Sequence, residues 1–264
     1  MRQMKHIYSL AALALIFSGL LSCSKIDTGG GGGGNSTTKG AITGSIIMYD
    51  DKGNANADDK AGVKVSLLKG GVEVSKATTL TTGKFAFANI PYGTYDMSYS
   101  RNDIGTYKVF NVTHAYNASA TVNGTLLSTI QLGQLSSTSI TAFTFQDSTY
   151  NGVPGMSYTI SVSPDPSTTS RGFFRIFMSL DPQVSNANYG VVATPRSLIS
   201  NNATGGFTRD ELRTIYGFSS GQTVYMIAYG ESAQPNDYTD PVSGKRIFPN
   251  LNMTTQPAFS FIVP

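Results

Sequence analysis

Short runs of alternating apolar and polar residues, separated by glycine-containing turns, are what most constrains the fold of this 264-residue chain. Val63–Leu68 alternates with a period of two, which is typical of a strand with one buried face. Lys69-Gly70-Gly71 and Thr82-Gly83 predict turns into further strands over Val72–Leu80 and Lys84–Ala88. This spacing favours packed β-sheets over helices.

The composition agrees with this fold class. Only 13% of the residues are charged, whereas Gly, Ser, Thr, Tyr and Phe are abundant, as expected for strands joined by many turns. Further strands are predicted over Ser139–Gln146, Met156–Ser163 and Ala258–Val263, and Phe173–Met178 is the most apolar candidate. We therefore expect an all-β protein.

Three ordered motifs in the first half carry a family resemblance. They are Ala61–Leu67, Thr82–Phe87 and Ile90–Tyr95. Together they resemble the carboxypeptidase regulatory-like, transthyretin-like family and the related surface-protein B-repeats, over about 90 residues. Such domains are non-catalytic spacers or accessory modules, so the resemblance implies a β-sandwich and no activity of its own.

The second half contains one helix signal. Thr208-Arg209-Asp210-Glu211 is a capping box, which predicts a short helix that stops at Gly217. Phe218–Tyr229 then resembles the penultimate strand of fibronectin type III and immunoglobulin-like sandwiches, in which a glycine turn leads into a strand with a tyrosine near its start. The resemblance implies a second β-sandwich.

The N-terminus has the features of an export signal. Arg2, Lys5 and His6 precede an apolar run, Ile7–Leu21, that is too short to span a membrane as a helix. Cys23 is the only cysteine. The segment Leu20-Leu21-Ser22-Cys23 resembles the bacterial lipoprotein processing box, which implies a lipidated Cys23 at the start of the mature chain.

A flexible linker is predicted after this cysteine, because Gly29–Gly34 consists of glycine alone. We therefore expect two β-sandwich domains behind a lipoprotein signal peptide and a Gly-rich linker, on an outer-membrane lipoprotein that faces the cell surface or the periplasm. The expected organisation is a signal peptide over 1–22, lipidated Cys23 and linker over 23–39, a carboxypeptidase regulatory-like sandwich over 40–134, and an immunoglobulin- or fibronectin III-like sandwich over 135–264.

Charge and motifs argue against several classes of function. Without the two basic residues of the signal, the chain has 17 basic and 16 acidic residues. It therefore lacks the excess of positive charge by which proteins bind nucleic acid. His114 would be the one histidine of the mature chain, and no nucleophile motif accompanies it. We therefore expect neither an enzyme nor a cofactor.

Calcium is the one ion for which the sequence offers a candidate. Asn54, Asn56 and Asp58 place oxygen ligands at alternate positions of the polar loop Asp50–Asp59, in the manner of hard-cation sites. The position resembles the calcium-binding loop of the B-repeats. The alternative is a solvated polar turn, since no glutamate closes the loop and Lys52 and Lys60 offset its charge.

The segment Glu231–Pro257 is the candidate partner-binding surface, because it is longer than ordinary loops between strands. We predict that Tyr238, Arg246 and Phe248 contact the partner there. In the alternative, Ile247, Phe248 and Leu251 fold back to cover an open sheet edge.

The sequence thus predicts a non-catalytic, lipid-anchored accessory protein of the cell envelope or surface, which binds a protein or a glycan. Two alternatives remain open: a fimbrillin-like structural subunit of a pilus, and a glycan-uptake accessory binding lipoprotein.

Overall fold

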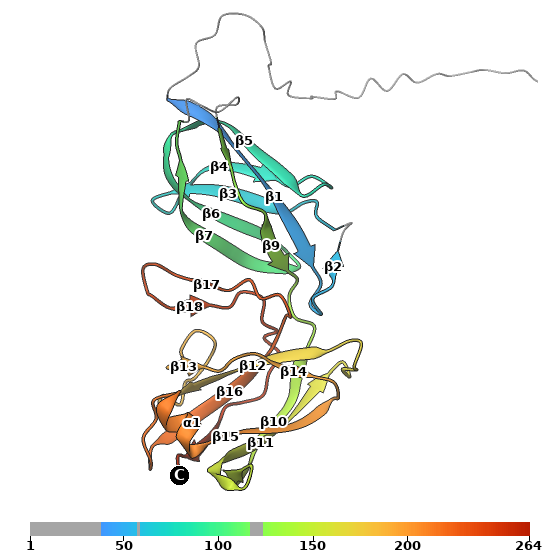
Figure 1. The fold of residues 1–264 in the computed structure, drawn as a ribbon, viewed down its shortest axis with the longest axis vertical. Coiled ribbons are helices and arrows are strands. Elements are labelled where there is room, and N and C mark those ends of the chain that lie inside the picture. The colour runs from blue at the N-terminus through green and yellow to red at the C-terminus, as the bar shows by residue number, and fades with distance from the viewer. Residues whose placement is uncertain (1–37, 57–58, 117–123) are drawn as a thin grey trace, which may run out of the picture. The chain divides into compact units, whose positions relative to one another are not determined.

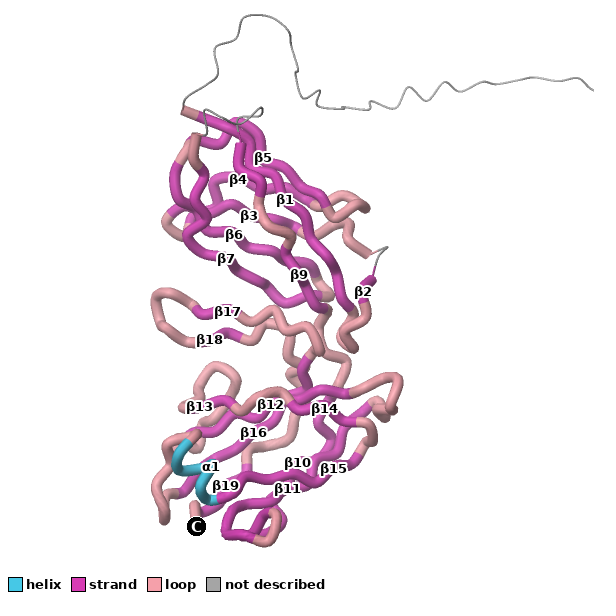
Figure 2. Tube along the Cα trace, in the orientation of Figure 1, coloured by secondary structure: helices cyan, strands magenta, loops and turns pink. Residues whose placement is uncertain are grey.

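The computed structural model describes residues 38–56, 59–116 and 124–264. These residues belong to one compact unit, which is nearly all β (Figures 1 and 2). The all-β sandwich fold expected from the sequence is confirmed.

The first sandwich consists of two sheets that pack face to face. Its first sheet contains β1 (Lys39–Tyr49), β2 (Ala55–Asn56), β5 (Lys84–Pro91), β8 (Gly124–Leu126) and β9 (Ile130–Gly133). Its second sheet contains, in this order, β4 (Val72–Thr78), β3 (Lys64–Lys69), β6 (Gly93–Arg101) and β7 (Ile104–His114). β1 is central in the first sheet, because it pairs antiparallel with β2 and β5 and parallel with β8 and β9.

The core of the first sandwich follows from the alternation in the sequence. Ile42, Ile46 and Met48 of β1 point inward, whereas Thr43, Ser45 and Ile47 are more exposed. Tyr95 and Tyr99 of β6 are also buried. The inward faces of both sheets meet in one hydrophobic cluster.

The second sandwich is built from the later strands. One sheet contains β10 (Ser139–Tyr150), β11 (Val153–Ser163) and β15 (Asn202–Thr208). The other contains β12 (Gly172–Ser179), β13 (Val191–Val192), β14 (Arg196–Leu198), β16 (Thr223–Glu231) and β19 (Phe259–Ile262). A hairpin of β17 (Tyr238–Thr239) and β18 (Arg246–Ile247) stands apart from both sheets.

The sheet that contains β12 and β16 is buried on both faces. Ile176 and Met226 point into the core shared with β10 and β11. Phe177 and Tyr229 point to the opposite face, where a second cluster with Phe248 covers them. A third layer of irregular chain therefore lies on this sheet.

The capping box forms as predicted. α1 (Arg209–Thr214) is the one helix among the described residues. Thr208 is its N-cap, and the Thr208 and Glu211 side chains each accept a hydrogen bond from the other residue's backbone N–H. The helix ends at Thr214 with Ile215 as its C-cap, shortly before Gly217 with φ of +76°, so its start lies where the sequence predicts and its end comes slightly earlier.

Among the described residues, strands pair only within residues 39–133 or within residues 139–262. The division of the chain into separate domains over 40–134 and 135–264 stays a prediction.

Candidate functional site

The segment Glu231–Pro257 forms an ordered hairpin at its centre. β17 and β18 pair through Tyr238 and Ile247, and through Thr239 and Arg246. Asp240 closes the turn, because its Oδ1 accepts hydrogen bonds from the backbone N–H groups of Val242 and Ser243. These bonds, from Ser243 above all, hold the pKa of Asp240 below its usual range. The turn is thus rigid enough to shape a surface.

Tyr238 fixes this hairpin against the first sandwich. Its ring centroid lies 6.4 Å from that of Tyr107 and 5.9 Å from that of Phe110, both on β7. Burial raises the pKa of the Tyr238 hydroxyl above its ordinary value, and Asp240 adds to the shift. Tyr238 therefore packs with one face and leaves only part of its surface for a partner.

Arg246 remains accessible on the same hairpin. Its Nε donates a hydrogen bond to Asp237 Oδ2, and 45% of its side chain is exposed. Its guanidinium carbon also lies 5.2 Å from the centroid of the Phe248 ring. The predicted contact of Tyr238 and Arg246 with a partner is compatible with these positions and stays a prediction.

Phe248, in contrast, lies in a core. It is only 4% exposed, and its ring packs edge-on against Phe177, with centroids 5.2 Å apart. Leu251 is buried in the same cluster. This burial favours the alternative in which Phe248 and Leu251 cover a sheet, although they cover its face and not its edge. Phe248 therefore offers no surface to a partner.

A buried ion pair supports the base of the hairpin. Arg175 Nε donates to Glu231 Oε1 over 2.8 Å, and their side chains are 2% and 1% exposed. Arg175 also lies over the Phe248 ring at 4.8 Å. Burial raises the pKa of Glu231, and Arg175 partly offsets this shift. The pair thus couples β12, β16 and the covering chain.

The hairpin turn and the first sandwich together line a pocket of about 440 Å³, which we call the hairpin pocket. Its lining residues are Leu68, Gly70, Gly71, Asp96, Lys108, Phe110, Asp240, Pro241 and Val242. The size lies within the usual range of about 300–1,000 Å³ for ligand sites. Apolar walls with a few charged groups suit a ligand that has apolar faces and polar edges.

Sequence reasoning missed the wall of this pocket that belongs to the first sandwich, which supplies six of the nine lining residues. Asp96, Lys108 and Phe110 belong to β6 and β7, more than 120 positions before the hairpin in the sequence. Nothing in a single sequence links these strands to the turn. In the structure, Asn111 follows Phe110 with φ of +57° and donates its backbone N–H to Asp96 Oδ1, which ties β7 to β6 beside the pocket.

The candidate calcium loop is only partly described. Asp58 lies outside the described residues, and Asn56 is described only through its backbone in β2. Asn54 donates its side-chain amide to Asp50 Oδ2, and its backbone N–H bonds Asp50 Oδ1. Asp51 accepts both the backbone N–H and the hydroxyl of Ser137. Calcium binding by this loop stays a prediction.

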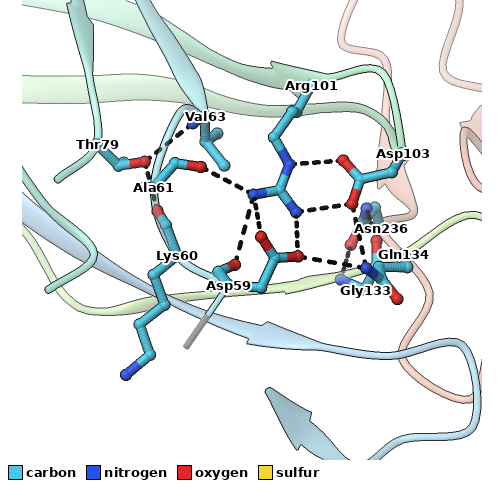
Figure 3. Close-up of polar contacts among 10 residues, drawn as sticks. All are labelled: Asp59, Lys60, Ala61, Val63, Thr79, Arg101, Asp103, Gly133, Gln134 and Asn236. Atoms are coloured by element: carbon cyan, nitrogen blue, oxygen red, sulfur yellow. Dashed lines mark hydrogen bonds and ion pairs between the residues drawn. The ribbon is translucent and has the colours of Figure 1, made fainter. Parts of the chain in front are cut away.

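The last carboxylate of that loop is held by an arginine. Arg101 donates to both oxygens of Asp59, over 2.9 and 2.6 Å, and to both oxygens of Asp103, over 2.5 and 2.7 Å (Figure 3). Gln134 Nε2 bridges the two carboxylates. The hydrogen bond from Arg101 holds the pKa of Asp103 below its usual range. A guanidinium therefore supplies the positive charge between these carboxylates.

A second polar contact ties the chain before the hairpin to the end of β9. Asn236 Oδ1 accepts from Gly133 N–H over 2.7 Å, and its Nδ2 donates to Gly133 O over 2.8 Å (Figure 3). Asn250 accepts from Asn236 N–H through its own Oδ1. Both asparagines are 1% exposed, so these bonds replace water completely at this point.

Two further residues singled out in the sequence are His114 and Cys23. His114 is the last residue of β7 and is buried, and its ring nitrogens contact Thr125 Oγ1 and Ile90 O. No group of three His, Cys, Asp or Glu side chains in the described part of the chain is placed to hold a metal ion. Cys23 lies outside the described residues. Within them, no helix is long and apolar enough to cross a membrane.

No family model matches the sequence, and no curated protein does. Among solved structures, a protein from Bacteroides uniformis proposed to bind carbohydrate is 12% identical over 84% of this chain and 98% of that chain, with a TM-score of 0.31. A DUF3823 family protein from Bacteroides ovatus is 12% identical over 86% of this chain and 100% of that chain, with a TM-score of 0.27.

A mutant type II cohesin–X-dockerin complex from Acetivibrio cellulolyticus is 21% identical, with a TM-score of 0.28, and here the match spans 37% of this chain and only 59% of the other. Similarities this distant assign no function. The site must be interpreted from its own residues.

Proposed function

We propose that this chain is a non-catalytic, lipid-anchored binding protein of the bacterial envelope, and that the hairpin pocket holds a glycan partner. The hairpin pocket is the observation that carries the proposal. Phe110 supplies an aromatic surface, while Asp96 and Lys108 supply an acceptor and a donor beside it. A sugar ring has apolar faces and a rim of hydroxyl groups, so both kinds of wall have a counterpart on the ligand.

The anchor in this proposal is Cys23, which rests on the sequence signal. The glycine run after it would let the folded part sample a distance of roughly 20 Å from the membrane, by the random-coil estimate for about 15 residues. A binding module on such a tether can reach a polymer without a rigid orientation.

The test uses residues 24–264, which are the mature chain without Cys23. Calorimetry measures the affinity of this protein for polysaccharides from the cell surface and the growth medium. Phe110→Ala removes the aromatic wall, and loss of about 1.5–3 kcal/mol of apolar contact weakens binding roughly tenfold or more. Phe145→Ala is the matched control, since Phe145 is 41% exposed on β10 and does not line the hairpin pocket.

Equal weakening by both variants, with equal loss of stability, would contradict a specific role for the hairpin pocket. If the parent protein binds none of these polysaccharides, the proposal is wrong. In that case a pilus subunit becomes the working alternative. That function needs a strand that can be exchanged between copies, and β19 is the candidate, because Phe261 near the C-terminus enters the core.

A further inference from the structure

A second, smaller pocket lies in the second sandwich, where the edge strands β14 and β15 face each other across the two sheets. Its volume is about 130 Å³, which corresponds to roughly four water molecules at about 30 Å³ each. It is lined by Tyr158, Ile160, Phe174, Arg196, Ser197, Leu198, Ala203, Thr204 and Gly205. We call it the edge pocket. None of these residues belongs to the hairpin pocket.

One of the residues that line the edge pocket, Tyr158, has a hydroxyl group without a protein partner. Tyr158 is 1% exposed, and no protein atom of the described residues forms a hydrogen bond with its Oη. The ring is fixed by edge-on contacts with Phe143 at 5.3 Å and tilted contact with Phe207 at 6.2 Å. A buried hydroxyl without a partner costs free energy, so its retention calls for an explanation.

The backbone beside Tyr158 is shaped to admit this hydroxyl. Gly205 lies directly opposite Tyr158 in the pairing of β11 with β15. A Cβ atom on Gly205 would lie 2.5 Å from Tyr158 Oη, far inside contact distance. Only glycine therefore leaves room for the phenol in this place, and the neighbouring strand is built around the polar end of the ring.

Arg196 adds a positive charge at the same pocket. Its guanidinium carbon lies 5.1 Å from the centroid of the Phe207 ring, and its Nη2 donates to Gly206 O over 3.3 Å. This is the one side-chain hydrogen bond found for Arg196 among the described residues, so most of the five N–H donors of its guanidinium have no protein acceptor. Stacking on Phe207 holds the plane of the guanidinium.

The neighbouring titratable groups do not oppose an anion. Burial raises the pKa of Tyr158 to about 12, with a smaller opposing effect of Arg196, so its hydroxyl stays protonated and can donate. Burial also raises the pKa of Tyr216. Glu211 is the acidic neighbour, and its carboxylate already accepts the N–H and the hydroxyl of Thr208 in the capping box.

We infer that the edge pocket is a binding site for a small carboxylate. The planar carboxylate matches the fork of N–H donors on Arg196, and the second donor is Tyr158 Oη. Ile160, Phe174 and Leu198 form the apolar part of the lining and receive the carbon end of the ligand. The pocket admits a short acid such as acetate, or the carboxylate group of a larger acid whose remainder stays outside.

The test measures direct binding of acetate to the mature chain by saturation-transfer NMR and by a chemical-shift titration, with sodium chloride at equal ionic strength as the reference. We expect a millimolar dissociation constant. Tyr158→Phe, which removes only the oxygen, should lower the affinity for acetate at least fivefold, and Arg196→Gln should abolish acetate binding. Tyr216→Phe is the matched control, since Tyr216 packs on Phe207 but does not line the pocket.

Glucuronate and glucose distinguish the source of the carboxylate. Binding of glucuronate with an affinity at least equal to that of acetate identifies an acidic sugar as an acceptable ligand, whereas binding of acetate alone restricts the site to short free acids. Glucose, which lacks the carboxylate, should not bind at the edge pocket.

Three results would overturn the inference. The first is that the parent protein gives no acetate signal, and the second is that a folded Tyr158→Phe variant binds acetate as tightly as the parent does. The third is a crystal grown in acetate in which only an ordered water, and no acetate, contacts Tyr158 Oη. Folding of each variant is checked by circular dichroism. Because the two pockets share no residue, the result is independent of the glycan test on Phe110.

Discussion

Removal of one member of the buried ion pair should be among the most destabilising single changes in this chain. Arg175→Met keeps the length and apolar character of the stem but leaves the Glu231 carboxylate alone in a site where it is 1% exposed. Breaking such a pair costs about 3–5 kcal/mol. The lost contact of the guanidinium with Phe248 adds up to about 2 kcal/mol.

These magnitudes translate into a clear thermal shift. At about 2–4 °C per kcal/mol for a chain of this size, Arg175→Met should melt at least about 6 °C below the parent. Urea unfolding monitored by circular dichroism provides the free energy independently. The double variant Arg175→Met, Glu231→Leu replaces both charges by apolar groups, so it should recover to within about 1–2 kcal/mol of the parent.

The pH dependence provides a second signature. Burial raises the folded-state pKa of Glu231 above its ordinary value of 4.5, and loss of Arg175 removes the partial offset. The folded state therefore favours the protonated acid, whose contribution is fully present below pH 4.5 and disappears as the pH rises through the folded-state pKa. The stability deficit of Arg175→Met relative to the parent should be smaller at pH 5 than at pH 8.

Two outcomes would refute this reasoning. If Arg175→Met lies within about 1 kcal/mol of the parent, the pair is not buried in solution as it is in the structure. If the double variant is as unstable as Arg175→Met, the loss comes from packing around Phe248 and not from an unpaired charge.

Four further predictions follow from other parts of the chain. Cys23→Ala should abolish membrane association and labelling by fatty acid, and unchanged fractionation would contradict the lipoprotein assignment. Millimolar calcium should raise the melting temperature of the parent but not of Asp58→Ala, whereas a parent without any response leaves only a polar turn. The fragment 40–134 should unfold cooperatively by itself, and absence of a transition would argue against a separate domain. Asn236→Ala should cost about 2–4 kcal/mol, because it leaves the N–H and C=O of Gly133 unpaired, and a loss below about 0.5 kcal/mol in urea unfolding would show that water replaces the side chain.

Local patterns predicted the strands and the helix well, because their signals lie within a few residues. The alternation in Val63–Leu68 corresponds to β3 (Lys64–Lys69), and the capping box corresponds to α1. Burial on one face leaves a period of two in the sequence. The same logic misses β7 and β15, since β7 has only half-buried residues over most of its length and β15 contains Gly205 and Gly206 against neighbouring tyrosine rings.

The candidate sites were less accessible to sequence reasoning, because they depend on contacts between distant segments. The hairpin turn could be predicted from Asp240–Lys245, but its opposite wall, Phe110 and Lys108, belongs to a strand with no sequence link to it. The edge pocket depends on Gly205, whose need for glycine arises only from the Tyr158 ring on the next strand. In both sites the informative quantity is a distance across strands.

The run Phe173–Met178 shows what a careful reading can still extract. A strand that is buried on both faces loses the period of two and appears as a continuous apolar run, which is how β12 appears in the sequence. Arg175 interrupts this run. A charge buried within such a strand is costly unless it is paired, and in the structure Arg175 has both a buried acidic partner and an additional layer of chain that encloses it. Glu231 at the end of β16 is that partner, and Phe248 belongs to that layer. The same requirement explains why Phe248 is unavailable to a ligand, since its ring encloses the charge that the strand could not otherwise bury.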